Sequence, residues 1–216
     1  MYVPKLLEET DPDVLHGLIR THPLGMWVTQ ANGELVANHI PFLLDAGRGR
    51  HGTLVAHVAR ANPVWESFST TVQSLIVFRG AETYITPSWY PSKQAHGRAV
   101  PTWNYAVVHV SGMPRAITDR DWLLQFVSRL TDTQEASRAQ PWKVADAPSD
   151  YIDRLLANIV GVEIPIDRIV GKWKANQPSP AADKLGVIAG LLDRGDAQAQ
   201  EMAALVQRHA APVPPK

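Results

Sequence analysis

The chain has 216 residues, of which 45% are hydrophobic and 19% charged, a balance that supports a packed core and excludes bulk disorder. Its 21 Lys and Arg match its 21 Asp and Glu, and this zero net charge gives no global electrostatic reason to bind nucleic acid. The absence of cysteine excludes disulfides and thiolate metal sites, and the lack of a long apolar run or a basic leader predicts a cytoplasmic protein without a membrane span.

The first part of the chain predicts one helix followed by strands joined by tight turns. Asp11 and Pro12 are typical of a helix start, and apolar residues at helical spacing extend that helix to about residue 22. Strands are expected at 24–30, 34–44 and 53–58, and Asn32-Gly33 predicts a hairpin. The turn at 47–52 matches G-x-G-x-x-G, but a strand follows it, so we interpret it as a hairpin loop and not a dinucleotide site.

The rest of the chain predicts more strands, one long loop and several helices. A short helix is expected at 61–68 with Asn62 as its cap, and a turn at Arg79-Gly80 separates two strands. Three prolines and little periodicity predict a loop at 87–101. The remaining strands are expected at 72–78, 81–86, 102–115 and 160–174, and the remaining helices at 119–130, 149–160, 181–194 and 197–209.

These elements predict an α+β fold that is mainly β. Short connections between strands imply antiparallel pairing, and six or seven such strands are expected to close into a barrel with peripheral helices. We expect residues 1–177 to form the barrel domain with its inserted helices. Residues 178–216 are expected to be a helical appendage and tail, not an independent domain.

Polar and aromatic side chains gather in four segments where strands end, at 37–42, 57–63, 100–105 and 171–178. Cations, short hydrogen-bonding side chains and flat aromatic rings together suit a planar ligand that carries a phosphate. Hydrolase and P-loop motifs are absent, and the scattered histidines form no metal-binding motif. The candidates are the cations Arg60 and Lys174, the polar residues Asn38, Asn62, Thr102 and Asn104, and the aromatic walls Trp103 and Trp173.

Several ordered blocks in the sequence resemble the PaiB-type, FMN-binding negative transcriptional regulator family. They are Met1-Tyr2-Val3-Pro4, Asn38-His39-Ile40-Pro41-Phe42, His57-Val58-Ala59-Arg60-Ala61-Asn62-Pro63-Val64-Trp65, Ser88-Trp89-Tyr90, Val100-Pro101-Thr102-Trp103-Asn104-Tyr105 and Trp173-Lys174-Ala175-Asn176-Gln177. The resemblance implies a split β-barrel of the flavin-reductase and pyridoxamine-phosphate-oxidase type. It also implies a homodimer with FMN near the dimer interface.

Carried over residue by residue, the resemblance assigns Arg60 and Lys174 to the FMN phosphate. It places Trp103 as a wall, and Asn38, His39, Thr102 and Asn104 along the ring or ribityl chain. Asn62 and Gln177 complete the expected cofactor-binding set. The late segment departs from the family pattern, which often reads Lys-Leu-Ser-Gln-Asn, because here it is Lys174-Ala175-Asn176-Gln177-Pro178.

The resemblance implies a flavin-dependent regulator, and two other roles stay open. The same barrel hosts flavin-dependent oxidoreductases, in which the flavin supplies the redox chemistry. A haem-binding relative, with His39 or His209 as ligand, is a further alternative. The family name implies a possible DNA partner, but the terminal helices mix charges of both signs, so we interpret them as a packing or dimer-contact element.

Overall fold

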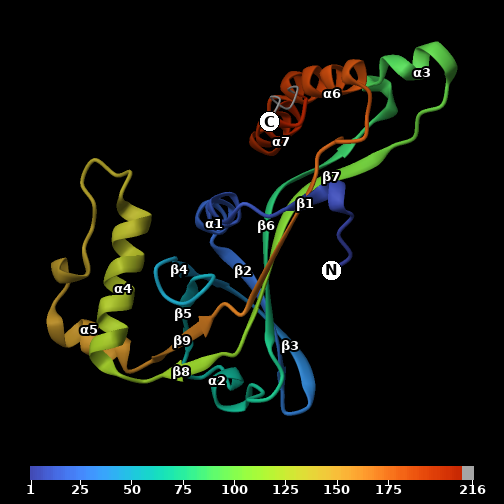
Figure 1. Cartoon of the computed structure of the whole chain (residues 1–216). Coiled ribbons are helices and arrows are strands. Elements are labelled where there is room, and N and C mark those ends of the chain that lie inside the picture. The colour runs from blue at the N-terminus through green and yellow to red at the C-terminus, as the bar shows by residue number, and fades with distance from the viewer. Residues whose placement is uncertain (211–216) are drawn as a thin grey trace. The chain divides into compact units, whose positions relative to one another are not determined.

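The computed structural model describes residues 1–210, which fall into two compact units built from discontinuous segments (Figure 1). Unit 1 comprises Met1–Thr21, Arg79–His109 and the chain from Val170 onward, and unit 2 comprises His22–Phe78 and Val110–Ile169. The helices expected as an appendage therefore belong to unit 1, and residues 211–216 of that appendage lie outside the described residues. None of the helices in residues 1–210 is both long and apolar enough to cross a membrane.

The strands of unit 1 are arranged in the order β1-β10-β7-β6. The strand β1 (Glu8–Glu9) pairs antiparallel with β10 (Arg168–Lys174), so that Glu8 lies opposite Lys172. The neighbouring strands are β7 (Thr102–Gly112) and β6 (Ser74–Ile85), which both continue into unit 2. Helix α1 (Pro12–Thr21) follows the 3-10 helix Lys5–Leu7 and packs closely on the sheet, because a Cβ on Gly171 would lie 2.2 Å from Leu15 Cδ2.

Two C-terminal helices, α6 (Ala181–Arg194) and α7 (Ala197–Arg208), lie side by side in unit 1 (Figure 1). They bury apolar side chains between them, including Leu191 and Met202. Trp89 packs against two glycines of α6 that leave room for it. A Cβ on Gly190 would lie 2.3 Å from the indole, and one on Gly186 would lie 1.9 Å from the Trp89 carbonyl oxygen. The segment that carries Trp89 is thus held against α6.

The prediction that residues 87–101 form a loop is wrong for its first part. This segment contains a 3-10 helix (Pro87–Trp89) and the helix α3 (Pro91–His96). Thr86 Oγ1 accepts a hydrogen bond from the Ser88 amide, and proline occupies the start of each helix, where its missing N–H costs nothing. The prolines therefore begin helices here, and the helices are too short to show a period in the sequence.

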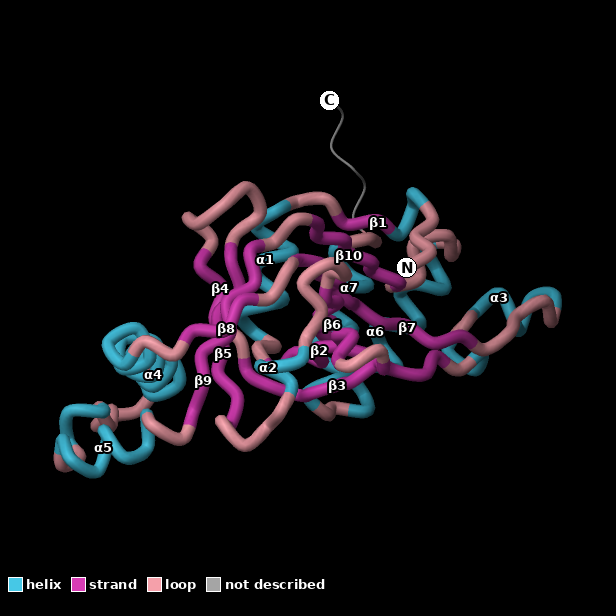
Figure 2. The backbone as a smooth tube through the Cα atoms, turned by 90° about the horizontal axis from the view of Figure 1, so that it is seen from below, coloured by secondary structure: helices cyan, strands magenta, loops and turns pink. Residues whose placement is uncertain are grey.

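Unit 2 contains a hairpin and a second sheet, both antiparallel. In the hairpin of β2 (Leu24–Ala31) and β3 (Glu34–Pro41), Asn32 and Gly33 have φ of 51° and 85°, as the Asn-Gly turn predicts. The start of β6 pairs with β2. The second sheet has the order β4-β5-β9-β8 (Figure 2). Its strands are β4 (Leu43–Asp45), β5 (Thr53–Ala59), β9 (Ile159–Pro165) and β8 (Arg115–Ile117).

The helices of unit 2 are α2 (Val64–Ser67), α4 (Arg120–Glu135), the 3-10 helix Val144–Asp146 and α5 (Ser149–Leu156). Asp119 caps α4 by accepting a hydrogen bond from the Trp122 amide. The core of this unit includes Trp27, Phe42 and Phe78, and the rings of Phe42 and Phe78 meet edge to face at 5.8 Å. Gly161 of β9 leaves the space that the Trp122 ring occupies.

The antiparallel α+β class is confirmed, and two details of the strand prediction are wrong. Arg79-Gly80 does not form a turn, because β6 runs through both residues and the missing side chain of Gly80 leaves room for Leu18. The expected strand at 160–174 is two strands, β9 and β10, separated after Pro165. The loop at 47–52 joins β4 to β5 in a hairpin, as predicted. Short strands raise the number in the described chain above the six or seven expected.

Candidate functional site

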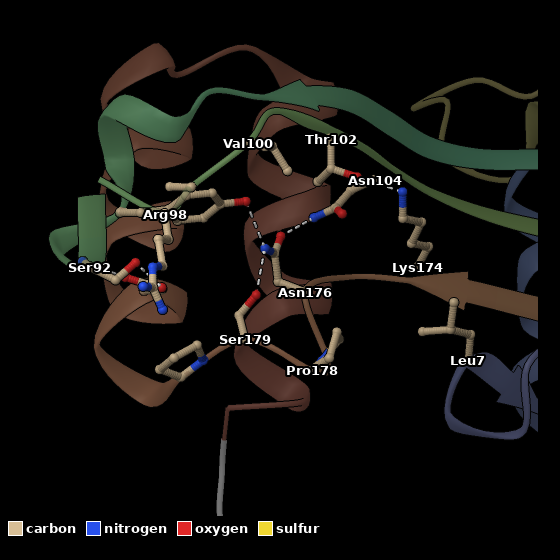
Figure 3. A pocket seen from close by; sticks show the side chains of 14 residues that line it. Leu7, Ser92, Arg98, Val100, Thr102, Asn104, Lys174, Asn176, Pro178 and Ser179 are labelled. Carbon is tan, nitrogen blue, oxygen red and sulfur yellow. Dashed lines mark hydrogen bonds between the residues drawn. The ribbon is translucent and has the colours of Figure 1, made fainter. Parts of the chain in front are cut away.

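A pocket of about 380 Å³ lies within unit 1, where β7 begins and the chain leaves β10 (Figure 3). This volume falls in the range of small-molecule sites, roughly 300–1,000 Å³. The 3-10 helix at residue 7, the segment 90–100 and the start of α6 complete its wall. Its lining consists of Leu7, Tyr90, Ser92, Arg98, Ala99, Val100, Thr102, Asn104, Lys174, Asn176, Pro178, Ser179, Pro180 and Asp183.

Two side-chain hydrogen bonds connect β7 to the end of β10 in this pocket. Lys174 Nζ donates to Thr102 Oγ1 at 2.6 Å, and Asn104 Nδ2 donates to Asn176 Oδ1 at 2.5 Å. Thr102 and Asn104 are two residues apart on a strand and therefore lie on the same face. Asn176 has φ of 58°, in the left-handed region that Asn tolerates better than most residues, and there the chain turns away from β10.

Asn176 is the centre of a buried polar network (Figure 3). Its Nδ2 donates to Tyr90 Oη and to Ser179 Oγ, each at 3.1 Å. Burial is the main cause that raises the pKa of Tyr90, so its hydroxyl stays protonated at neutral pH. Since Tyr90 Oη accepts from Asn176, its O–H remains a hydrogen-bond donor.

One polar atom of the network has no partner. Asn104 is 1% exposed, and its Oδ1 is a buried acceptor with no hydrogen bond from the described residues. An unmatched buried amide oxygen costs about 1–3 kcal/mol. A ligand that donates an N–H or O–H in the pocket would remove that cost, so Asn104 indicates a binding site with a requirement for a donor.

The other side of the pocket joins α3 to α6. Asp183 is buried and accepts hydrogen bonds from the Ser92 amide at 3.0 Å and from Ser92 Oγ at 2.7 Å. Together with Trp89 on the α6 glycines, this contact holds the segment that carries Tyr90 and Arg98. Arg98 adds a second cation to the lining.

A second group of predicted residues lies in unit 2. Arg60 donates from Nε to the Ala157 carbonyl at 2.7 Å and from Nη2 to the Ile159 carbonyl at 3.1 Å. Its guanidinium also lies over the Trp65 ring, 5.8 Å from the centroid. The hydrogen bonds and the ring contact of Arg60 therefore connect α2 to the segment that follows α5.

Asn62 and Asn38 form the rest of this group. Asn62 Nδ2 donates to Asn38 Oδ1 at 2.8 Å, and Asn62 Oδ1 accepts from the Val64 amide at the start of α2. Asn38 Nδ2 is buried without a partner among the described residues. His39, the next residue on β3, is exposed.

Three of the predicted site residues, Thr102, Asn104 and Lys174, come together in the unit 1 pocket. Trp103 lies between Thr102 and Asn104 and so alternates to the opposite face of β7, where it is 50% exposed and 6.5 Å from the Tyr84 ring. Gln177 does not line the pocket, because its amide accepts from the Ala175 N–H and donates to the Trp173 carbonyl.

Sequence reasoning missed Asn176, Tyr90 and Ser179 as pocket residues. Asn176 stands inside a segment that the sequence singled out, but only its backbone turn and its bond to Asn104 distinguish it from Gln177. Tyr90 belongs to a quoted block of the resemblance, and its position in a segment interpreted as a loop hid its contact with Asn176. No sequence signal singles out Ser179.

The histidines do not gather into a metal site. Residues 1–210 contain no cluster of three or more His, Asp or Glu side chains suited to hold a metal ion. Burial lowers the pKa of His57, which lies 5.6 Å from the Phe126 ring, and of His109. Burial also lowers the pKa of His209. These three side chains are therefore neutral at pH 7.

Residues 1–168 match the family model described as "Putative FMN-binding domain". The chain belongs to this family. It is 34% identical to an uncharacterized protein of Emericella nidulans, over 90% of this chain and 92% of the relative. It is 28% identical to the protease synthase and sporulation protein PAI 2 of Bacillus subtilis, over 96% and 97%. The PaiB-type resemblance and the FMN cofactor are thereby confirmed.

Similarity to a solved structure supports the fold. The FAD and heme binding protein from Mycobacterium smegmatis has a TM-score of 0.55 and 18% identity, with 77% of this chain and 73% of that chain covered. At this identity the similarity shows a shared split-barrel fold. It does not transfer either ligand to this chain.

The residues of the unit 1 pocket fit a flavin nucleotide. The pocket offers two cations, hydroxyl donors and an acceptor that lacks a donor, and FMN has negative charge, carbonyl oxygens and N–H and O–H groups to match them. When bound, FMN would supply redox chemistry that protein side chains do not supply themselves. The protein's part is to bind, orient and shield it.

Proposed function

We propose that the unit 1 pocket is the place where this protein binds FMN. The observation that carries the proposal is the unmatched Asn104 Oδ1, in a pocket that Lys174 and Tyr90 also line. Each of these polar groups is costly to bury without a partner, and together they complement the polar atoms of a flavin ring. The carry-over of Asn38, His39, Arg60 and Asn62 stays a prediction. So does the role of Trp103 and Gln177.

We further propose that the protein acts as a flavin-dependent regulator without direct DNA contact through α6 and α7. The name of the Bacillus subtilis relative refers to protease synthesis and sporulation. Two of the three cations in these helices already have partners: Arg194 pairs with Asp196 and donates to Thr83, and Lys184 donates to the His209 carbonyl, so that Arg208 is left at the end of α7. A DNA-reading helix needs free cations along one face.

A homodimer is part of this proposal. Tyr84 and Trp103 form an exposed aromatic pair on neighbouring strands, and Val100 is 75% exposed close by in sequence. Aromatic side chains of this kind are enriched at the centres of protein interfaces. Light scattering coupled to size exclusion is expected to give twice the 23.8 kDa chain mass, and a Trp103→Lys variant is expected to shift the protein toward monomer.

A flavin-dependent oxidoreductase is the second candidate function. The observation that favours it is Tyr90, whose hydroxyl keeps its proton inside the pocket because burial raises its pKa. That O–H can donate a hydrogen bond that orients a substrate or the flavin ring. Anaerobic mixing with NADH or NADPH tests this role, and loss of the yellow colour within seconds would favour the oxidoreductase over the regulator.

A titration of the purified chain with FMN tests the central proposal. We expect quenching of FMN fluorescence with a one-to-one stoichiometry and a raised melting temperature. The Asn176→Ala variant is expected to weaken binding by about tenfold or more, because it removes the anchor of Asn104, Tyr90 and Ser179. A chain that binds no FMN in either measurement would contradict the proposal.

A further inference from the structure

We infer that Asn104 and Lys174 hold the imide edge of the isoalloxazine ring, and not the phosphate to which the resemblance assigns Lys174. The inference rests on the proposed binding of FMN in the unit 1 pocket. It makes Asn104, Lys174 and Tyr90 the residues that distinguish a flavin ring from other planar phosphorylated ligands.

The first step concerns the unmatched acceptor. Asn104 Nδ2 donates one of its two N–H groups to Asn176 Oδ1, and the Asn104 carbonyl oxygen is the buried acceptor without a partner among the described residues. A phosphate dianion has only acceptor oxygens, and it would lie against this oxygen without a proton between them. The imide edge of a flavin carries an N–H, which is the group that a buried, unmatched acceptor requires.

The second step concerns the groups on either side. Lys174 Nζ has three donors, one of which goes to Thr102, and Tyr90 keeps its O–H after accepting from Asn176. The pocket therefore offers donors beside the unmatched acceptor Asn104 Oδ1, whereas the Asp183 carboxylate in its lining already accepts from Ser92. An imide edge presents a carbonyl, an N–H and a second carbonyl, which is the complement of this set.

The third step concerns the orientation of the two amides. Turning Asn104 and Asn176 over together would keep their mutual hydrogen bond, and it would present an N–H of Asn104 to the pocket. That arrangement would favour an anion in place of the imide. One orientation therefore predicts that Asn104 contacts the imide of the flavin ring, and the other predicts that it contacts the phosphate. Ligand analogues that lack one of these groups distinguish the two orientations.

The experiment compares three ligands: FMN, riboflavin and FMN methylated at the imide nitrogen. Methylation removes the N–H and leaves the phosphate, so we expect the wild-type chain to bind methylated FMN about tenfold more weakly than FMN. In Asn104→Ala the two should bind equally. Equal binding of FMN and methylated FMN by the wild-type chain would overturn the inference. This comparison uses the wild-type chain alone, so it does not depend on whether a variant folds.

Lys174→Met tests the other half. Removing a ring contact weakens FMN and riboflavin by the same factor, so the ratio of their affinities should stay within about twofold of wild type, with each weakened on the order of tenfold. A loss confined to FMN would assign Lys174 to the phosphate and overturn the inference. Arg98→Met and Arg60→Met, tested separately, should show such a selective loss if either holds the phosphate.

The matched control is Lys172→Met. Lys172 is a cation of the same strand, lies over the Tyr2 and Tyr105 rings and is not in the pocket lining, so the affinities for all three ligands should be unchanged. A chain that binds none of the three ligands would contradict the proposed function. A chain that binds FMN without regard to imide methylation would contradict only the assignment of the ring.

Discussion

The polar groups of the unit 1 pocket and those around Arg60 in unit 2 are alike in residue type and differ in their partners. In unit 2 the Arg60 guanidinium donates to two backbone carbonyls and both functional atoms of the Asn62 amide are bonded, while Asn38 Nδ2 is a buried donor without a partner among the described residues. In unit 1 the Asn104 oxygen is unmatched among residues 1–210, and within the same residues one hydrogen bond is made by the three N–H donors of Lys174. The comparison teaches that the partners of a side chain, more than its type, separate a ligand site from a structural one.

The largest effect is expected from Gly190→Val in unit 1. A side chain there would collide with the Trp89 indole, which lies within 2.3 Å of an ideal Cβ, so the free energy of unfolding should fall by about 3 kcal/mol. FMN affinity should fall as well, because Tyr90 follows Trp89. Chemical denaturation measures the first effect and fluorescence titration the second.

Gly17→Ala is the matched control, since nothing lies within 4 Å of its ideal Cβ in α1. It should raise stability by up to about 1 kcal/mol. An unaltered flavin affinity in Gly190→Val would show that α6 does not hold the pocket.

The next effect concerns pH and unit 2. Burial lowers the pKa of His57 below its ordinary value of 6.5, so the unfolded chain binds a proton more readily than the folded chain. Stability is then fully present above pH 6.5 and is lost as pH falls from there toward the lowered pKa. His57→Phe should reduce the slope between pH 6.5 and 5.5 by up to about 1.4 kcal/mol per pH unit.

Denaturation curves at pH 7.5, 6.5 and 5.5 measure this slope. His109 and His209 contribute with the same sign and remain in the variant, so part of the slope should persist. An identical slope in His57→Phe and wild type would contradict the prediction.

A smaller effect is expected from Arg60→Ala. The change leaves the carbonyls of Ala157 and Ile159 to solvent and removes the contact with Trp65, which should cost about 1 kcal/mol of unfolding free energy. Thermal and chemical denaturation without flavin measure it. A variant as stable as wild type would mean that Arg60 is free for a ligand. The polar groups around Arg60 would then no longer differ in this respect from those of the unit 1 pocket.

The smallest effect on stability is expected from Lys174→Met without flavin. Its one side-chain hydrogen bond is to Thr102, and the aliphatic stem is retained by Met, so the change should stay below about 0.5 kcal/mol. The same denaturation experiment measures it. A loss larger than that of Arg60→Ala would show that Lys174 serves the fold more than the ligand.

Local signals in the sequence predicted much of the fold. Asn32-Gly33 specified a hairpin because its positive φ angles suit few other residues, and α6 was predicted at 181–194 with the bounds that the structure shows. The turn predicted at Arg79-Gly80 is wrong, because Gly80 lies within β6 and its missing side chain allows close packing against Leu18. That distinction depends on a residue more than sixty positions away in the sequence.

The site was predictable to the level of segments. Thr102, Asn104 and Lys174 were singled out because short polar side chains at strand ends are uncommon in a core; they line one pocket, and their contact with the cofactor stays a prediction. The choice of Asn176 over Gln177 could not be made from the sequence. It depends on the left-handed turn at Asn176 and on bonds to residues 72 and 86 positions away.

The family match ends at residue 168, whereas Lys174, Asn176 and Asp183 of the pocket all come after it. The segment by which the chain is classified thus supplies one part of the pocket, and the last strand and α6 supply another. Relatives that share the classified segment are therefore expected to share only that part of the proposed pocket. Comparing them over the stretch that corresponds to residues 174–183 tests whether the rest of its lining is kept.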